Sequence, residues 1–301
     1  MFWKLITLFK KTVRLITRAD FDGIACGVLL SAQEKIDRFL FVEPKAMQDG
    51  EVKVGSDDII ANLPYHPKAF LWFDHHITNQ VSGFFRGKFF LAPSAARVVF
   101  DYYPPGSLTC YEALVQEADR IDSGDLDMAD IFEPQGCVLL AFTIDPNSRA
   151  DEPYWIKLIH LLRDQPVALA MEDAEVRARC QQTLEDFKVY HRLLLNNTRQ
   201  DGTVVITDFR GINFQGKVNR FLVYSLFPEA NISVKIFRDY QQKGRIGISV
   251  GKNIFNKTSN INVGELLSHY GGGGHQGAGS CRVPVEDAED VLNKIIKALK
   301  N

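Results

Sequence analysis

Residues 69–73 form a short apolar run that leads directly into Asp74, His75 and His76. Such a run predicts a buried strand, so the three polar side chains would be held at a strand end. A carboxylate and a neutral imidazole nitrogen are ligands that hard and borderline divalent cations accept. The chain is therefore expected to build a sheet with metal-compatible groups at one edge.

Strand and helix patterns alternate through the first half of the chain. Apolar β-rich runs predict strands, and longer segments with one apolar face predict helices, one of them capped by Ser94. The strands are expected at residues 12–17, 38–42, 57–61 and 69–73, and the helices at residues 23–32, 95–103 and 108–121. This alternation predicts an α/β domain with a largely parallel sheet, whose ligands bind beyond the carboxyl ends of the strands.

The second half predicts a long charged helical connector followed by another, smaller α/β domain. Strands are expected at residues 204–206, 232–237 and 246–250, helices at 261–270 and 285–299, and a Gly-rich turn at 271–279. The predicted organisation is an N-terminal domain over residues 1–165, a connector over 166–200 and a C-terminal domain over 201–301. A length of 301 residues agrees with two domains, because a single hydrophobic core rarely grows to that size.

Composition narrows the class of protein. The formal net charge of -2 argues against a large basic surface for long duplex nucleic acid, but a short or end-bound polyanion remains compatible. Five scattered cysteines without a CxxC pair indicate reduced thiols. Residues 1–11 show neither a signal-peptide pattern nor a membrane span, so a cytoplasmic location is expected.

Two acidic segments are candidates to join His75. Asp20 and Asp22 lie two positions apart, so both can face one point beyond a strand end, and a cation between them would relieve their repulsion. A pair of solvated turn aspartates is the alternative. Asp119 and Asp122 share one helical face at i, i+3, so either could enter the site.

Three motifs in this order and spacing resemble the DHH phosphoesterase superfamily with its DHH-associated C-terminal domain. The chain looks most like exopolyphosphatase-related proteins, and also like RecJ-like exonucleases and nanoRNA phosphatases. The motifs are Asp20-x-Asp22-Gly23, Asp74-His75-His76 and Gly272-Gly273-Gly274-His275-x-x-Ala278-Gly279.

The resemblance implies a division of roles. His75 and Asp122, with Asp22, would bind the metal, and His76 would contact the phosphoryl group. Asp74 would orient its neighbours or act as a minor ligand. Adjacent residues at a strand end are expected to point to opposite sides, which agrees with separate roles for the two histidines. The Gly-rich segment, Gly272 to Gly274 with His275, would hold the substrate through backbone N–H groups.

The chain departs from the superfamily pattern at two metal positions. Arg18 stands where relatives carry a histidine, and Asn62 stands where they carry a bridging aspartate. A guanidinium cannot bind a cation, and an amide is a poor bridge. We therefore expect one Mn²⁺ or Mg²⁺ per site, two being left open, with Arg18 beside Asp20 supplying positive charge. Gly251-Lys252 stands where relatives carry an Arg-Ser pair, so the identity of the substrate and the role of Lys252 are open.

The sequence thus predicts a phosphohydrolase in which a metal-activated water cleaves a phosphodiester or phosphoanhydride bond. The substrate would be a short phosphorylated molecule, such as an oligonucleotide, a nucleotide or polyphosphate, and a homodimer is left open. The alternative is a non-catalytic module that senses a nucleotide or polyphosphate, for which Arg18 and Asn62 are the best arguments.

Overall fold

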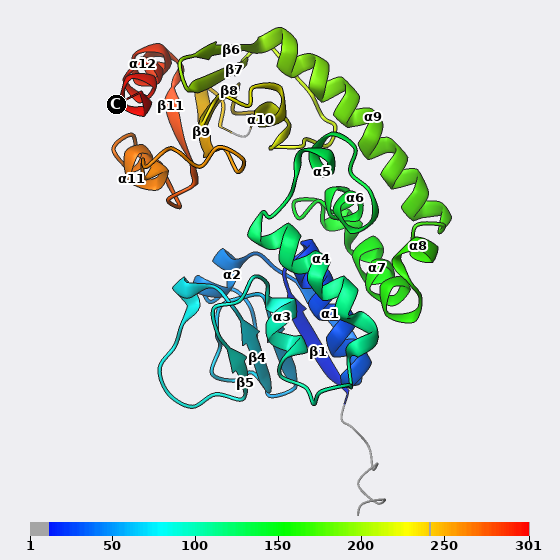
Figure 1. Cartoon of the computed structure of the whole chain (residues 1–301). Coiled ribbons are helices and arrows are strands. Elements are labelled where there is room, and N and C mark those ends of the chain that lie inside the picture. Colours follow the sequence, from blue (N-terminus) through cyan, green and yellow to red (C-terminus); the bar gives the residue numbers. More distant parts are fainter. Residues whose placement is uncertain (1–11, 241, 301) are drawn as a thin grey trace, which may run out of the picture. The chain divides into compact units, whose positions relative to one another are not determined.

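A computed structural model of the chain describes residues 12–240 and 242–300, which group into two compact units (Figure 1). The first unit comprises residues 12–126 and 134–180, and the second comprises residues 127–133 together with the described residues from 181 onward. The expectation of no signal peptide or membrane span at residues 1–11 concerns a segment outside the described residues. Among the helices that are described, none is long and apolar enough to cross a membrane.

The first unit contains a five-stranded, entirely parallel sheet with the strand order β2-β1-β3-β4-β5. Its strands are β1 (Val13–Thr17), β2 (Ile36–Phe41), β3 (Asp58–Ala61), β4 (Leu71–Asp74) and β5 (Gly87–Phe89). The predicted parallel sheet is confirmed, although β2 and β4 are each displaced by one or two residues from the expected bounds. Strand β4 includes Asp74 as its last residue, and β5 was not expected. Gly87 allows β5 to approach β4, because a Cβ atom there would lie 2.0 Å from the Trp72 carbonyl oxygen.

Helices cover this sheet. Helix α1 contacts α3, α4 and α7, and its residues from Phe21 to Leu30 are buried without a polar face, as expected for a helix between a sheet and other helices. The opposite sheet face packs an apolar cluster around Trp72 and Met47. The helices of the unit are α1 (Phe21–Gln33), α2 (Pro44–Gln48), α3 (Ala95–Phe100), α4 (Glu112–Ser123), α6 (Gly136–Thr143), α7 (Glu152–Asp164) and α8 (Val167–Ala170).

The second unit has a six-stranded sheet with the order β10-β11-β9-β8-β7-β6, in which only the β7–β8 pair is parallel. Helices α11 and α12 pack on one face through an apolar core. The strands are β6 (Thr198–Asp201), β7 (Val204–Phe209), β8 (Ile232–Arg238), β9 (Arg245–Lys252), β10 (Gly273–Gly274) and β11 (Ala278–Pro284); the helices are α5 (Met128–Phe132), α10 (Leu222–Leu226), α11 (Val263–Ser268) and α12 (Ala288–Leu299). The predicted α/β class is confirmed for both units.

The long helix α9 (Ala174–Asn197) occupies most of the predicted connector, and the chain passes from the first unit to the second within it. Several predicted bounds were wrong. Helix α3 ends three residues early, α4 is preceded by a 3-10 turn, and α11 is shorter than residues 261–270. The segment at residues 271–279, predicted as a Gly-rich turn, contains β10 and the start of β11. Strand β10 pairs with β11, and β11 pairs with β9, which gives this glycine-rich backbone a strand conformation.

Candidate functional site

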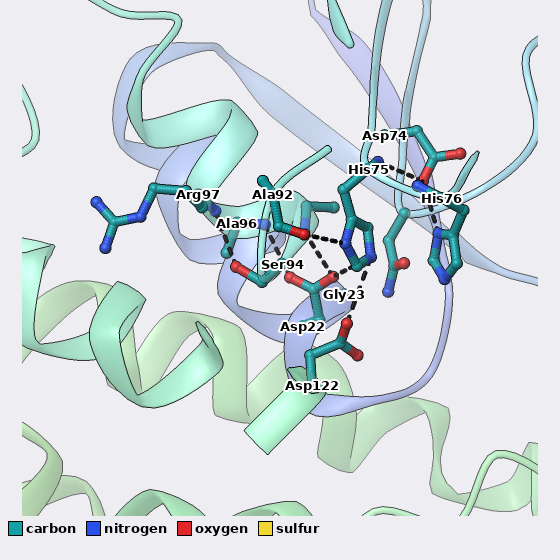
Figure 2. Close-up of polar contacts among 12 residues, drawn as sticks. Asp22, Gly23, Asp74, His75, His76, Ala92, Ser94, Ala96, Arg97 and Asp122 are labelled. Carbon is teal, nitrogen blue, oxygen red and sulfur yellow. Dashed lines mark hydrogen bonds and ion pairs between the residues drawn. The ribbon is translucent and has the colours of Figure 1, made fainter. Parts of the chain in front are cut away.

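Polar side chains from separate elements gather at the carboxyl end of the parallel sheet in the first unit (Figure 2). Arg18 and Asp20 follow β1, Asn62 follows β3, and Asp74 ends β4. Carboxyl ends of parallel strands meet at the same edge, so residues distant in sequence become neighbours there. Asp22 comes from the first turn of α1 and Asp122 from the last turn of α4.

Asp22 is held by the N-terminus of α3. Its Oδ2 accepts a hydrogen bond of 2.8 Å from the Ala95 N–H, and its Oδ1 accepts one of 2.8 Å from the Ala96 N–H. The side chain is almost fully buried, with 1% of its surface exposed. Burial, followed by the nearby carboxylates of Asp122 and Asp20, raises the pKa of Asp22 well above its usual value. A buried carboxylate in this position favours a bound cation or proton.

His75 presents a free nitrogen to two carboxylates. Its Nδ1 lies 2.9 Å from the Ala92 carbonyl oxygen, and a carbonyl only accepts, so Nδ1 carries the hydrogen. Its Nε2 lies 3.3 Å from Oδ2 of Asp122 and 3.8 Å from Oδ2 of Asp22. That Nε2 is buried and lacks a hydrogen-bond partner within the described residues.

This arrangement fits a divalent cation. One imidazole nitrogen and two carboxylate oxygens lie within 4.8 Å of one another, and the lone pair of Nε2 faces the same space as the carboxylates. A lone pair against two anionic groups is unfavourable unless a positive charge lies between them. The hydrogen bond to Ala92 fixes the ring orientation, as the outer partners of metal-binding histidines commonly do.

The structure distinguishes Asp122 from Asp119. Asp122 faces His75, and burial followed by the Asp20 carboxylate raises its pKa. Asp119 instead accepts a 2.6 Å hydrogen bond from the Ser94 hydroxyl and pairs with the Arg97 guanidinium at 2.7 Å. Ser94 caps α3 by accepting from the Arg97 N–H, as predicted. Asp119 therefore supports the helix that holds Asp22 and does not lie among the candidate ligands.

Asp74 orients the two histidines that follow it. Its Oδ1 accepts from the N–H groups of His75 and His76 and lies 2.8 Å from Nδ1 of His76, while its Oδ2 accepts from the Asn79 amide. The Asp74 carboxylate raises the pKa of His76 above its usual value. His76 thus holds a proton on Nδ1 and leaves Nε2 for another partner.

The two histidine rings do not point to opposite sides as expected. Their centroids lie 4.2 Å apart in an edge-to-face contact, because β4 ends at Asp74 and the backbone turns there. Their polar partners nevertheless differ, since His75 faces Asp22 and Asp122 while His76 faces Asp74.

Asp20 has protein partners on both oxygens. Its Oδ1 accepts from the Gly23 N–H at 2.8 Å and from the Asn62 amide at 2.9 Å, and its Oδ2 lies 3.2 Å from Nη1 of Arg18. Arg18 is also 3.4 Å from a carboxylate oxygen of Glu43. Asn62 adopts a left-handed backbone conformation (φ 58°) that places its amide against Asp20. The predicted proximity of Arg18 and Asp20 is therefore present.

The predicted substrate-binding residues lie in the second unit. Backbone N–H groups of Gly271, Gly272 and His275 already donate to backbone carbonyls, so these three do not form the open nest expected from the glycine content. The side chain of His275 is exposed, and Lys252 ends β9 with its N–H donating to the Gly277 carbonyl.

Sequence patterns could not reveal the backbone groups that complete the site. The Ala92 carbonyl and the N–H groups of Ala95 and Ala96 hold His75 and Asp22. Alanine carries no functional side chain, so only the spatial approach of α3 to α1 identifies them.

Comparison with known proteins supplies a relative at the level of the whole chain. No protein-family model and no curated protein matches the sequence. Among solved structures, the pGpG-specific phosphodiesterase PggH from Vibrio cholerae is 33% identical, with a TM-score of 0.84, over 96% of this chain and 99% of that chain.

Two more distant structures share the fold. An exopolyphosphatase-related protein from Bacteroides fragilis is 14% identical, with a TM-score of 0.54, over 97% of this chain and 94% of that chain. RecJ from Thermus thermophilus, in complex with Mn²⁺, is also 14% identical with a TM-score of 0.54, over 97% of this chain and 52% of that chain. The predicted resemblance is confirmed, and the chain belongs to the DHH phosphoesterase superfamily.

Proposed function

We propose that this protein is a metal-dependent phosphodiesterase that hydrolyses a linear 5′-phosphorylated dinucleotide such as pGpG. Phosphoester hydrolysis is the activity of a DHH-type enzyme, and the substrate is the new element of the proposal. The observation that carries it is the 33% identity, over nearly the full length of both chains, to a phosphodiesterase described as pGpG-specific. The small net charge of -2 agrees with a short substrate.

Asp22, His75 and Asp122 would hold the cation, which we propose to be Mn²⁺ or Mg²⁺. When bound, such an ion supplies a water of lowered pKa and withdraws charge from a phosphoryl oxygen. The orphaned Nε2 of His75 supports this assignment, because its ring is already fixed through Nδ1.

His76 is proposed to contact the phosphoryl group. Its Nδ1 is held by Asp74, so a second proton on Nε2 makes the ring a cationic donor. A donor that strengthens its hydrogen bond as charge develops on phosphoryl oxygens favours the transition state over the ground state. Hydrolysis of pGpG would break the bond between phosphorus and the 3′ oxygen and release two molecules of GMP.

Arg18 is proposed to take the place of a second cation. The oxygens of Asp20 already contact Gly23, Asn62 and Arg18, which leaves this carboxylate neutralised by the protein itself. One ion per chain is the expected stoichiometry.

A panel of substrates tests the proposed function. With Mn²⁺ or Mg²⁺, we expect turnover of pGpG to exceed turnover of longer 5′-phosphorylated oligoribonucleotides, a cyclic dinucleotide and inorganic polyphosphate. Turnover of polyphosphate alone would contradict the dinucleotide assignment. Binding of pGpG without turnover under every metal would favour a sensor instead.

A further inference from the structure

Lys235 lies on the face of the second unit's sheet that is turned away from the apolar core. Its neighbours along β8, Val234 and Ile236, are buried in the core with α11 and α12. Side chains alternate between the two faces of a strand, so Lys235 projects from the opposite face. The lysine is half-buried there.

The strand register aligns Lys235 with hydroxyl residues on four other strands and with a glycine on the fifth. It pairs with Ser249 on β9, and Ser249 in turn pairs with Ser280 on β11. Directly paired residues project from the same face of a sheet. The complete transverse row consists of Thr198, Thr207, Lys235, Ser249, Ser280 and Gly273.

Lys235 has no anionic partner. No carboxylate pairs with its ammonium in the part of the chain that the structure describes, and burial lowers the pKa of Lys235 without an opposing charge. Arg282, on the same face, instead pairs with Asp239 at 2.6 Å. A half-buried cation without a counter-ion is costly to keep and favours an anion from outside the chain.

The hydroxyls beside Lys235 are also available. Neither the Ser249 nor the Ser280 side chain has a hydrogen-bond partner among described residues, whereas Thr198 and Thr207 at the other end of the row bond to each other at 2.8 Å. Ser280 pairs with Gly273, so the row reaches the Gly-rich segment. The ammonium lies over the Phe237 ring, 5.7 Å from its centroid, and has no anion beside it in the described part of the chain. It therefore projects from the same sheet face as the two unpaired hydroxyls.

We propose that Lys235, Ser249 and Ser280 form a binding site for a phosphate group of a nucleotide ligand. A lysine is a point charge suited to phosphate, and two hydroxyls supply the further donors that a compact polyanion accepts. The inference rests on the proposed function for its choice of a phosphorylated dinucleotide as ligand. The ligand would then contact this sheet face in addition to Gly273 and His275.

The test measures binding and turnover separately on the full chain. Binding of pGpG is followed by calorimetry in EDTA, where hydrolysis is not expected, and turnover is followed with Mn²⁺. We expect Lys235→Met to weaken binding by at least about 10-fold, the equivalent of about 1.4 kcal/mol, and Lys235→Arg to keep most of the affinity. Lys294→Met is the matched control, because Lys294 lies on α12, which packs on the other sheet face.

The outcomes separate the two proposals. If the wild type hydrolyses pGpG and Lys235→Met binds pGpG as tightly as the wild type does, the phosphate site is overturned and the proposed function stands. If the wild type binds pGpG but does not hydrolyse it, the proposed function is contradicted. The phosphate site is supported in that case when Lys235→Met loses the binding and Lys294→Met keeps it. If Lys235→Met does not fold, Ser249→Ala replaces it, and wild-type affinity in that variant overturns the site.

Discussion

Nε2 of His75 lies 3.3 Å from Oδ2 of Asp122, although one residue follows β4 and the other lies in the last turn of α4. The Nδ1 of the same ring is committed to the Ala92 carbonyl. This pair defines the direction from which a cation would bind, with Asp22 as the third group.

Asp122 and Asp119 form a matched pair of test sites on one helix. Asp122→Asn should lower Mn²⁺ affinity by at least about 100-fold, beyond the 10–100-fold that loss of an outer partner costs. Asp119→Asn should keep metal affinity but lower the free energy of unfolding by about 1–3 kcal/mol, because it weakens charged hydrogen bonds to Ser94 and Arg97. Calorimetric titration and thermal unfolding measure both, and equal metal affinity in the two variants would contradict the assignment.

Metal affinity should fall as the pH falls. Burial and neighbouring carboxylates raise the pKa of Asp22, and a raised pKa means that protons compete with the cation at a higher pH than for an ordinary aspartate. Affinity is therefore highest above the raised pKa and is lost below it. Titrations with Mn²⁺ from about pH 8 to about pH 5 should show this loss together with proton release on binding. A pH-independent affinity would speak against Asp22 as a ligand.

Gly23 is required for the fold near the site. A Cβ atom there would lie 2.1 Å from the Arg18 carbonyl oxygen and 2.9 Å from the Thr17 hydroxyl. Gly23→Ala should therefore lower the free energy of unfolding by about 1–3 kcal/mol, the usual cost of overpacking. Gly55→Ala is the control, since only the end of the Asp58 side chain approaches that position, at 3.9 Å. Equal unfolding midpoints for both variants would refute this role.

Arg18 should affect turnover without affecting metal content. If its guanidinium supplies the charge proposed for it, Arg18→Met should lower kcat by about 100- to 1000-fold, the range for loss of one electrostatic contact to the transition state. Arg38→Met, on the exposed surface of β2, should leave kcat unchanged. Elemental analysis should find one ion per chain in all three proteins, and two tightly held ions in the wild type would contradict the one-metal proposal.

Much of the parallel sheet could be predicted, because each apolar run is local in sequence. The edge strand β5 and the helices between Met128 and Asp164 were not predicted, and β11 was hidden by its glycine, serine and proline residues. These segments depend on pairing or packing with distant residues, which periodicity does not report.

The candidate site also contains residues that the sequence identifies and residues that only the structure identifies. Side chains with distinctive chemistry, such as Asp22 and His75, could be chosen from the sequence, and the choice between Asp119 and Asp122 needed the superfamily resemblance. The partners of Asp119 became visible only in three dimensions. Lys235 gave no sequence signal, because its importance comes from cross-strand register.

The most direct test of the central claim is pGpG hydrolysis by wild-type protein and by His75→Ala, measured with Mn²⁺ and after chelation by EDTA. We expect the wild type to release GMP only with metal, and His75→Ala to show neither turnover nor bound Mn²⁺ while keeping its thermal unfolding midpoint. His66→Ala, a substitution outside the site, should behave like the wild type. Wild-type turnover by a folded His75→Ala variant would contradict the assignment of this histidine as a metal ligand.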